Sequence, residues 1–195
     1  DDSSGTYNIS HLISFNTEYN SPDLKIDESF FNDWQKVNDN NINPGKILGG
    51  SVLSLALGDS RLYVGGAFSA VDGKVHKGIA AVKLNGEVDH TWRPYVDNNV
   101  NVITTELSSS NTEQVFIGGA FNQVGKMANG LAALDIYSSE PIDDFAVDQL
   151  EKGALIKTLA LQNRVLIIGG KFTGASNASI KNLGAMNVVL GNTSS

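Results

Sequence analysis

The stretch LYVGGAFSAV, from Leu62 to Val71, decides the fold because close variants of it occur twice more in the chain. VFIGGAFNQV spans Val115–Val124, and LIIGGKFTGA spans Leu166–Ala175. Each copy has three apolar residues, a Gly-Gly pair, one further residue and a phenylalanine. The Gly-Gly pairs begin at positions 65, 118 and 169 and therefore lie 53 and 51 residues apart. A period of about fifty residues is typical of propeller blades rather than of helical solenoids.

The repeated residues have a physical reason to recur together. Glycine permits unusual φ angles and a close approach of a neighbouring backbone where a strand ends. The phenylalanine that follows is then placed to fill the gap between adjacent units. We therefore interpret nine residues as a structural signature: Gly65, Gly66, Phe68, Gly118, Gly119, Phe121, Gly169, Gly170 and Phe172.

The Gly-Gly stretch is the second of four strand-like segments in each unit. First segments are VLSLAL, VITTEL and IKTLAL at 52–57, 102–107 and 156–161. Third segments are GIAAV, GLAAL and NLGAM at 78–82, 130–134 and 182–186, and fourth segments are VDHTW and IDDF at 88–92 and 142–145. Apolar and β-branched runs between turn residues predict strands, and only residues 29–37 suit a short helix. Asn85-Gly86 predicts a type I′ hairpin between the third and fourth strands.

The sequence thus predicts an all-β fold, a β-propeller-type repeat of four-stranded antiparallel blades, as a single module over residues 1–195. The expected parts are a half-blade at 11–30, an insertion at 31–51, blades at 52–92 and 102–145, and a partial blade of three strands at 155–190. That is about three blades' worth, with half-blades at both ends, whereas closed propellers have about four to eight blades. We expect a part of a larger propeller, one of two copies that close a ring, or a filament subunit.

Composition excludes several classes of function. The chain has 195 residues, with 14 basic and 21 acidic side chains and a net charge of −7. This acidic balance argues against nucleic-acid binding. Cysteine is absent, which excludes disulfides and thiol chemistry. No apolar run reaches the roughly eighteen residues of a membrane span.

Propeller geometry brings the loops between second and third strands to the same face as the links between units. Polar and aromatic residues of these segments are our candidate ligand-binding residues: Asp72, Lys74, His76, Lys77, Trp92, Arg93, Asn98, Lys126, Asn129 and Lys181. They either bind a glycan or an acidic peptide, or they form exposed ion pairs worth less than about 1 kcal/mol each. We favour the second interpretation because loops are polar in any case.

Metal and cofactor sites have little support. His11, His76 and His90 are the only histidines, and they lie in different segments of the repeat, so a three-histidine metal site is not expected. Asn and Asp clusters at 38–41 and 97–99 offer oxygens to calcium, yet turn formation explains them better. We expect no cofactor and no metal ligand, and leave calcium open.

Catalysis is also not expected. Asp143 and Asp144 are the only adjacent pair of aspartates after residue 2, but neighbouring strand residues point to opposite faces and cannot act across one glycosidic bond. Nucleophile-elbow, P-loop and zinc-protease motifs are missing. We therefore assign no catalytic residue and expect that the chain is not an enzyme.

Segments 62–68, 78–94 and 98–103, with the sequences LYVGGAF, GIAAVKLNGEVDHTWRP and NNVNVI, resemble the delta-60 repeat of large secreted or surface bacterial proteins. Asp89 and Trp92 match the ending of that pattern, whereas the second unit's ending at 142–145 is one residue shorter. A weaker likeness links the chain to kelch-like repeats of fungal cell-surface landmark proteins. The resemblance implies a β-propeller, secreted or at the cell surface, and implies no catalytic residues.

These observations predict a non-catalytic extracellular or cell-surface module for assembly, display or adhesion. Its expected partners are proteins or further copies of itself, bound through exposed sheet edges, and a glycan remains open. The alternative is a carbohydrate-binding or glycoside-hydrolysing propeller domain. Nucleic acid is not an expected partner, and no membrane span is expected in this segment.

Overall fold

The computed structural model describes residues 15–16, 25–26, 47–48, 50–107, 113–142, 145, 150–175 and 178–188. These residues form β-strands, turns and irregular segments, so the prediction of an all-β protein is confirmed. No helix in these ranges could span a membrane. The predicted helix at 29–37 and residues His11, Asp143 and Asp144 lie outside the described residues.

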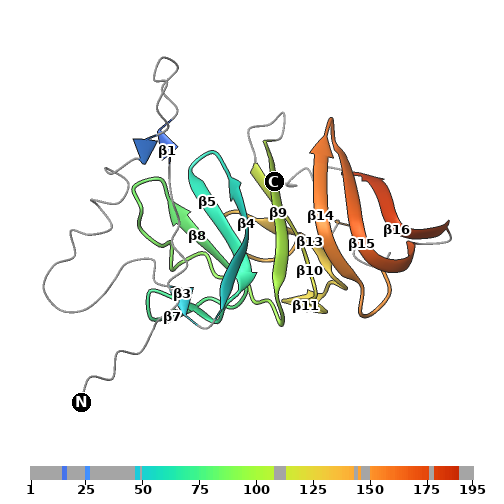
Figure 1. The fold of residues 1–195 in the computed structure, drawn as a ribbon, viewed down its shortest axis with the longest axis horizontal. Helices are drawn as coiled ribbons and strands as arrows, with labels where there is room; N and C mark the ends of the chain where they lie inside the picture. The colour runs from blue at the N-terminus through green and yellow to red at the C-terminus, as the bar shows by residue number, and fades with distance from the viewer. Residues whose placement is uncertain are drawn as a thin grey trace, which may run out of the picture.

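Three three-stranded antiparallel sheets form the body of the fold (Figure 1). The first sheet contains β4 (Ser51–Leu57), β5 (Arg61–Ala67) and β8 (Ile79–Lys83). The second contains β9 (Val100–Leu107), β10 (Glu113–Gly119) and β13 (Leu131–Asp135). The third contains β14 (Leu155–Gln162), β15 (Val165–Ala175) and β16 (Ala178–Asn187). In each sheet the Gly-Gly strand is the middle one.

Short strands complete the described fold. They are β1 (Phe15–Asn16), β2 (Lys25–Ile26), β3 (Ile47–Leu48), β6 (Ala70–Val71), β7 (Lys74–Val75), β11 (Gln123–Val124) and β12 (Lys126–Met127). Antiparallel pairing joins β1 to β2, β3 to β6 and on to β7, and β11 to β12. Two of these small sheets thus continue from the ends of the Gly-Gly strands β5 and β10.

The fourth strand expected at 88–92 is not formed, so the prediction of a four-stranded blade is wrong at 52–92, whereas the fourth segment at 142–145 is only partly within the described residues. Val88 makes a single bridge to Val82, and Pro141 makes one to Leu134. Asp89 accepts hydrogen bonds from the backbone N (3.0 Å) and Oγ1 (2.6 Å) of Thr91, which turn the chain directly after Val88. Pro141 has no N–H to donate to a ladder.

The type I′ turn predicted at Asn85-Gly86 is also wrong, because only Gly86 (φ +89°) has positive φ there. The Gly86 and Lys83 amides donate to Lys83 O (2.9 Å) and Glu87 O (2.8 Å), the pattern of a three-residue loop with a glycine bulge. Paired positive φ values occur instead at Asp72-Gly73 (52° and 69°) and at Asn163-Arg164 (51° and 64°). Each of these pairs joins two strands as a two-residue loop.

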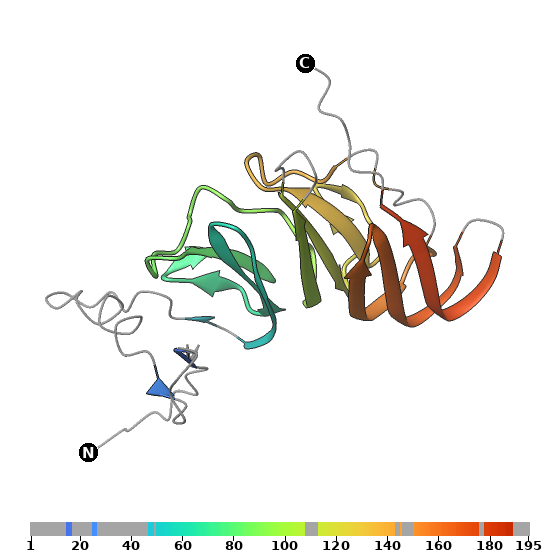
Figure 2. The same cartoon turned by 90° about the horizontal axis from the view of Figure 1, so that it is seen from above.

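The sheets stack face to face in chain order, as Figure 1 shows along the long axis and Figure 2 from above. One core layer lies between the first and second sheets and a second layer between the second and third. In β10, Val115 and Ile117 enter the first layer while Phe116 enters the second, as the two-residue period of a strand requires. A third cluster, with Val64 and Val82, lies on the opposite face of the first sheet.

The first glycine of each pair gives the next sheet room to approach. A Cβ built at Gly65 would lie 2.9 Å from Cδ1 of Ile103, and one at Gly118 would lie 2.6 Å from Cγ2 of Ile156. Both contacts are with the first strand of the following sheet, and both are closer than real carbon atoms pack. The glycine that recurs in each unit therefore allows the sheets of neighbouring units to pack closely.

Candidate functional site

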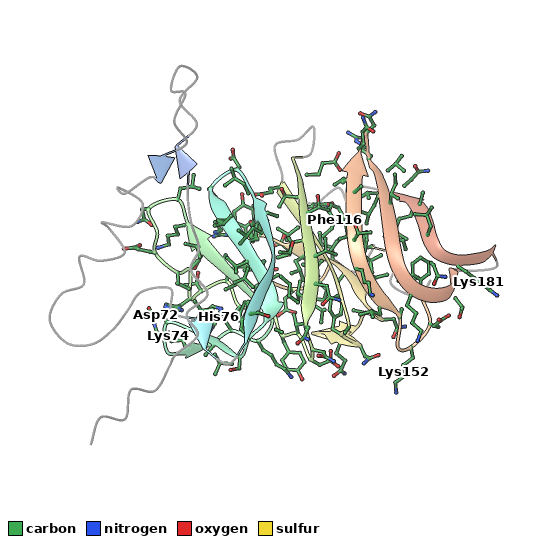
Figure 3. All side chains as sticks on the ribbon, viewed as in Figure 1. Asp72, Lys74, His76, Phe116, Lys152 and Lys181 are labelled. Atoms are coloured by element: carbon green, nitrogen blue, oxygen red, sulfur yellow. The ribbon has the colours of Figure 1, made fainter. Side chains whose placement is uncertain are left out.

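The ten candidate ligand-binding residues do not gather at one place. Asp72, Lys74 and His76 lie together around the β6–β7 hairpin, and Lys181 lies at the opposite end of the molecule (Figure 3). Lys181 belongs to β16, paired with Thr173, and therefore does not lie in the loop where we expected it. Lys126 lies in β12, but its side chain is outside the described part.

Two of the candidates belong to a chain of polar contacts, Asp72–His90–His76. Nε2 of His90 lies 3.4 Å from Oδ2 of Asp72, and Nδ1 of His90 lies 3.0 Å from Nε2 of His76. A proton on Nε2 of His90 suits the carboxylate, and His76 then donates from Nε2 to Nδ1 of His90. The chain ties the β6–β7 hairpin to the segment that follows β8.

His76 is buried in this arrangement, with 2% of its surface exposed. Burial lowers the pKa of His76 to about 4, and the electrostatic effects of His90 and Arg93 act in the same direction. The ring is therefore neutral at pH 7, and it is not presented to an external ligand. The sequence did not indicate the His76–His90 contact, because it placed these histidines in different segments of the repeat.

Trp92 is a core residue rather than a binding platform. Its side chain is buried in the first core layer, and its Nε1–H donates to the carbonyl of Asp135 in the second sheet at 3.0 Å. Its ring lies 5.1 Å from that of Tyr63, tilted by 60°. Trp92 therefore joins the first sheet to the second and is unavailable for stacking on a sugar.

Acidic residues of the links between sheets bond the segments that follow the signature phenylalanines of the next sheet. Oδ1 of Asp97 accepts hydrogen bonds from the backbone N of Asn122 (2.8 Å) and of Gln123 (3.1 Å). Glu151 accepts one from the backbone N of Thr173 at 2.7 Å and another from its hydroxyl. Asn122 and Thr173 each follow the signature phenylalanine directly. We call these two sets of contacts the link clamps.

Two asparagines of the candidate set are also engaged within the fold. Asn129 donates from Nδ2 to the carbonyl of Leu150 at 2.8 Å, and Oδ1 of Asn98 accepts from the backbone N of Asn99 at 2.9 Å. The side chains of Lys74, Lys77, Arg93 and Lys181 are exposed. Among the candidates whose side chains the structure describes, Asp72, His76, Trp92 and Asn129 thus contact other segments of the fold, whereas four cations are exposed.

A second polar cluster, between the first and second sheets, was not predicted. Nη2 of Arg61 lies 3.0 Å from Oδ2 of the buried Asp89, and Nη1 donates to the carbonyl of Ile136. Burial opposes ionisation of Asp89, but hydrogen bonds from Thr91 and the charge of Arg61 outweigh it and lower its pKa. The sequence feature that could have indicated the Arg61–Asp89 pair is the aspartate at position 89 in the segment VDHTW, which ends the repeat.

Glu113 and Tyr63 lie on the same side of this cluster and are both buried. Burial raises the pKa of Glu113, and the nearby Asp59 carboxylate adds to the effect. Burial and the charge of Glu113 likewise raise the pKa of Tyr63. A carboxyl group in this position costs stability when it ionises, because burial disfavours its charged form.

Metal ligands do not converge in the part of the chain described here, where no group of three or more His, Asp or Glu side chains is placed to hold an ion. Oδ1 of Asn98 accepts a local hydrogen bond from the backbone N of Asn99, as turn chemistry predicts, whereas Oδ1 of Asp97 accepts from backbone N–H groups of the next sheet. The 38–41 cluster lies outside the described residues. Comparisons with known proteins find no matching family model, no matching curated protein and no matching solved structure.

Proposed function

We propose that this chain is a β-propeller-type module, similar to delta-60 repeats, that works outside the cell or at its surface as a non-catalytic scaffold. In this proposal the stacked sheets are blades, and their rigid packing holds the connecting loops in fixed positions for display, adhesion or assembly. Loops on a rigid scaffold are where proteins of many folds place their binding residues.

The observation that carries the proposal is the repeated use of equivalent residues between sheets. Phe121 and Phe172 are buried in the first and second core layers, and Asp97 and Glu151 bond the residues that directly follow them. Units that each cover the next in the same manner are what a blade architecture requires. The fourth segments, reduced to single bridges, would be short outer strands of such blades.

The fate of the candidate residues supports a scaffold over an enzyme or a lectin. His76 and Trp92 are buried, and Asn129 bonds the backbone of a neighbouring link. A sugar site commonly needs an exposed aromatic ring beside polar groups, and Trp92 does not supply one. Among the candidates whose side chains the structure describes, the exposed cations are Lys74, Lys77, Arg93 and Lys181.

The test is a comparison of the chain with a triple variant, Lys74→Ala, Lys77→Ala and Arg93→Ala, on a glycan array and in glycosidase assays. The proposal predicts no selective glycan binding and no sugar release from either protein. A tagged form of the protein should also be cleaved by protease that is added to intact cells producing it. Selective binding that the triple variant abolishes, or hydrolysis by the unmodified chain, would favour the carbohydrate alternative and refute the proposal.

A further inference from the structure

The fourth segment of the first unit bonds the outer edge of its sheet. The amide of Asp89 donates to the carbonyl of Ala81, and the amide of Lys83 donates to that of Glu87, both at 2.8 Å. These two bonds flank the single bridge of the segment. Ala81 and Lys83 belong to β8, which lies at the edge of the sheet. An edge that would otherwise present an unbonded carbonyl and an unbonded amide is thereby closed.

The second unit repeats this pattern at equivalent residues. The amide of Ile142 donates to the carbonyl of Ala133, and the amide of Asp135 donates to that of Glu140, both at 2.9 Å. Ala133 and Asp135 belong to β13, the strand of the second sheet that corresponds to β8. Two units therefore use a short extended segment, rather than a full strand, to close the same edge.

The corresponding edge of the third sheet is formed by β16 (Figure 1) and is open in the described part of the chain. In each unit the third strand pairs with the first glycine of the middle strand. Counting from that pair makes Ala185 and Asn187 the equivalents of Ala81 and Lys83. No described residue bonds the outer carbonyl of Ala185 or the outer amide of Asn187, and both residues are exposed.

The direction of these groups follows from the next residue along the chain. The amide of Val188 donates to the carbonyl of Arg164 at 2.8 Å, on the side of β15. Successive backbone groups of a strand point to alternate sides, so the amide of Asn187 points to the outer edge. The third sheet thus presents the same donor and acceptor that the fourth segments bond in the first two sheets.

Met186 lies between these two edge groups and has less cover than its equivalents. Val82 and Leu134 are 3% and 0% exposed, and each forms a bridge to an apolar residue of its fourth segment, Val88 or Pro141. Met186 is only half-buried, although it packs against the second core layer. An apolar side chain opposite Met186 would extend that layer.

We propose that the outer edge of β16 binds an acidic, extended segment of a partner protein, which adds to the third sheet as its fourth strand. The backbone of this segment bonds Ala185 O and Asn187 N, and one of its apolar residues lies opposite Met186. Addition of a strand to an exposed edge is a common mode of peptide recognition, in which backbone hydrogen bonds supply affinity. The inference rests on the proposed scaffold function and names one kind of partner for it.

Charge is the reason that we expect an acidic segment. Residues 151–195 contain one acidic and five basic side chains, a net charge of +4 in a chain whose net charge is −7. The fourth segments of the first two units carry acidic residues at or beside the bonded positions: Glu87, Asp89 and Glu140. Opposite charge both attracts and selects a partner. The basic side chains of the third unit are all exposed: Lys152, Lys157, Arg164, Lys171 and Lys181.

One acidic residue of a fourth segment has a defined cationic partner. Nη2 of Arg61 lies 3.0 Å from Oδ2 of Asp89. The strand register makes Val165 the equivalent of Arg61, and Arg164 directly precedes Val165. The third unit therefore also carries an arginine at this end of its middle strand, close to the place where an acidic segment would lie.

The first test is amide hydrogen exchange of the full chain, read at Asn187 against its two bonded equivalents. Without a partner, the amide of Asn187 should exchange at least about tenfold faster than those of Lys83 and Asp135, because no described residue supplies an acceptor for it. Equal protection of the three amides would show that another segment of the chain or a second copy already fills the edge, and would overturn the inference.

The second test is an NMR titration with the synthetic peptide GEVDHTW, the sequence of residues 86–92, with capped ends. The peptide at millimolar concentration should slow exchange of the Asn187 amide and shift resonances of β16 more than those of β8 or β13. A peptide methylated on the amide nitrogen of its aspartate cannot donate to Ala185 O and should bind about tenfold more weakly. The peptide with Glu87→Lys and Asp89→Lys should also bind more weakly, by a factor that decreases in high salt.

Two variants of the full chain assign the site. Asn187→Pro removes the outward amide and should abolish peptide binding, whereas the matched control Asn187→Ala keeps that amide and should bind normally. Thermal unfolding shows whether Asn187→Pro is folded, and the methylated peptide tests the same edge of the unmodified chain if it is not. Absence of peptide binding, equal binding of the three peptides, or equal binding by two folded variants would overturn the inference.

Sedimentation velocity of the unmodified chain and of Asn187→Pro distinguishes a partner protein from a second copy. Self-association that Asn187→Pro abolishes would assign the edge to a second copy and would overturn the inference, whereas equal behaviour of the two proteins is expected. These outcomes do not affect the scaffold proposal, which selective glycan binding or sugar release would refute.

Discussion

Acidification should destabilise this protein through His76. Burial beside His90 and Arg93 lowers the pKa of His76 to about 4, against about 6.5 in an unfolded chain. Between these values the unfolded state binds a proton that the folded state does not, so stability falls as the pH decreases. Linkage gives a loss of about 2 kcal/mol from pH 7 to pH 5, approaching about 3 kcal/mol near pH 4. Above about pH 7 the contribution of His76 is nearly constant.

The assay is urea unfolding at pH 7, 6 and 5 for the unmodified chain and for His76→Gln. Glutamine keeps a donor for Nδ1 of His90 but does not titrate, so the variant should lose most of the pH dependence in this range. The other charged groups around His76 are Asp72 and Lys74 of its own hairpin and His90 and Arg93 of the segment after β8. Equal pH dependence in both proteins, or an unmodified chain more stable at pH 5 than at pH 7, would refute the reasoning.

Three further predictions concern stability and are measured by urea or thermal unfolding. Asp97→Ala removes two hydrogen bonds from backbone N–H groups of the next sheet and should cost about 1–2 kcal/mol; a cost no larger than that of Asn98→Ala would contradict the link clamp. Glu113→Gln should stabilise the protein at pH 7 by about 1 kcal/mol, because burial raises the pKa of Glu113 and its ionisation opposes folding. The variant should lose this advantage at pH 4. Destabilisation at pH 7 would show that the carboxylate is well accommodated. Phe121→Ala should lower the free energy of unfolding by about 3–5 kcal/mol, because it leaves a cavity in the first core layer. Tyr137 is exposed, so Tyr137→Ala should change this free energy by less than about 0.5 kcal/mol. Similar effects of the two substitutions would contradict the assigned packing.

The strand segments were predictable because their signals are local. Consecutive apolar and aromatic residues before each Gly-Gly pair define β5, β10 and β15, and this signal lies within each segment itself. The fourth strand at 88–92 was predicted wrongly because a side chain competed with the ladder: Asp89 bonds Thr91 and turns the chain. The Asn85-Gly86 turn was assigned the wrong type for a similar reason, since the extra bulge residue depends on how β8 pairs beyond the loop.

The candidate site was less predictable because its contacts are not local. Asp97 was expected in a polar link, but its partners are backbone amides 25 and 26 residues away, which no side-chain pattern marks. His76 and His90 meet only because the β6–β7 hairpin folds back toward the end of β8. The burial of Trp92 depends on the position of the second sheet, which supplies the carbonyl of Asp135. These features required the packing of whole sheets to be known.

The central claim is that three equivalent sheets stack into one body, and residue-resolved hydrogen exchange tests it most directly. Amides of β5, β10 and β15 lie in the middle strands, and the core layers couple each of these sheets to the next. Their slowest amides should exchange with one common free energy of opening, equal to that of global unfolding. Three separate opening energies, each unaffected by Phe121→Ala or Asp97→Ala in the neighbouring units, would contradict it.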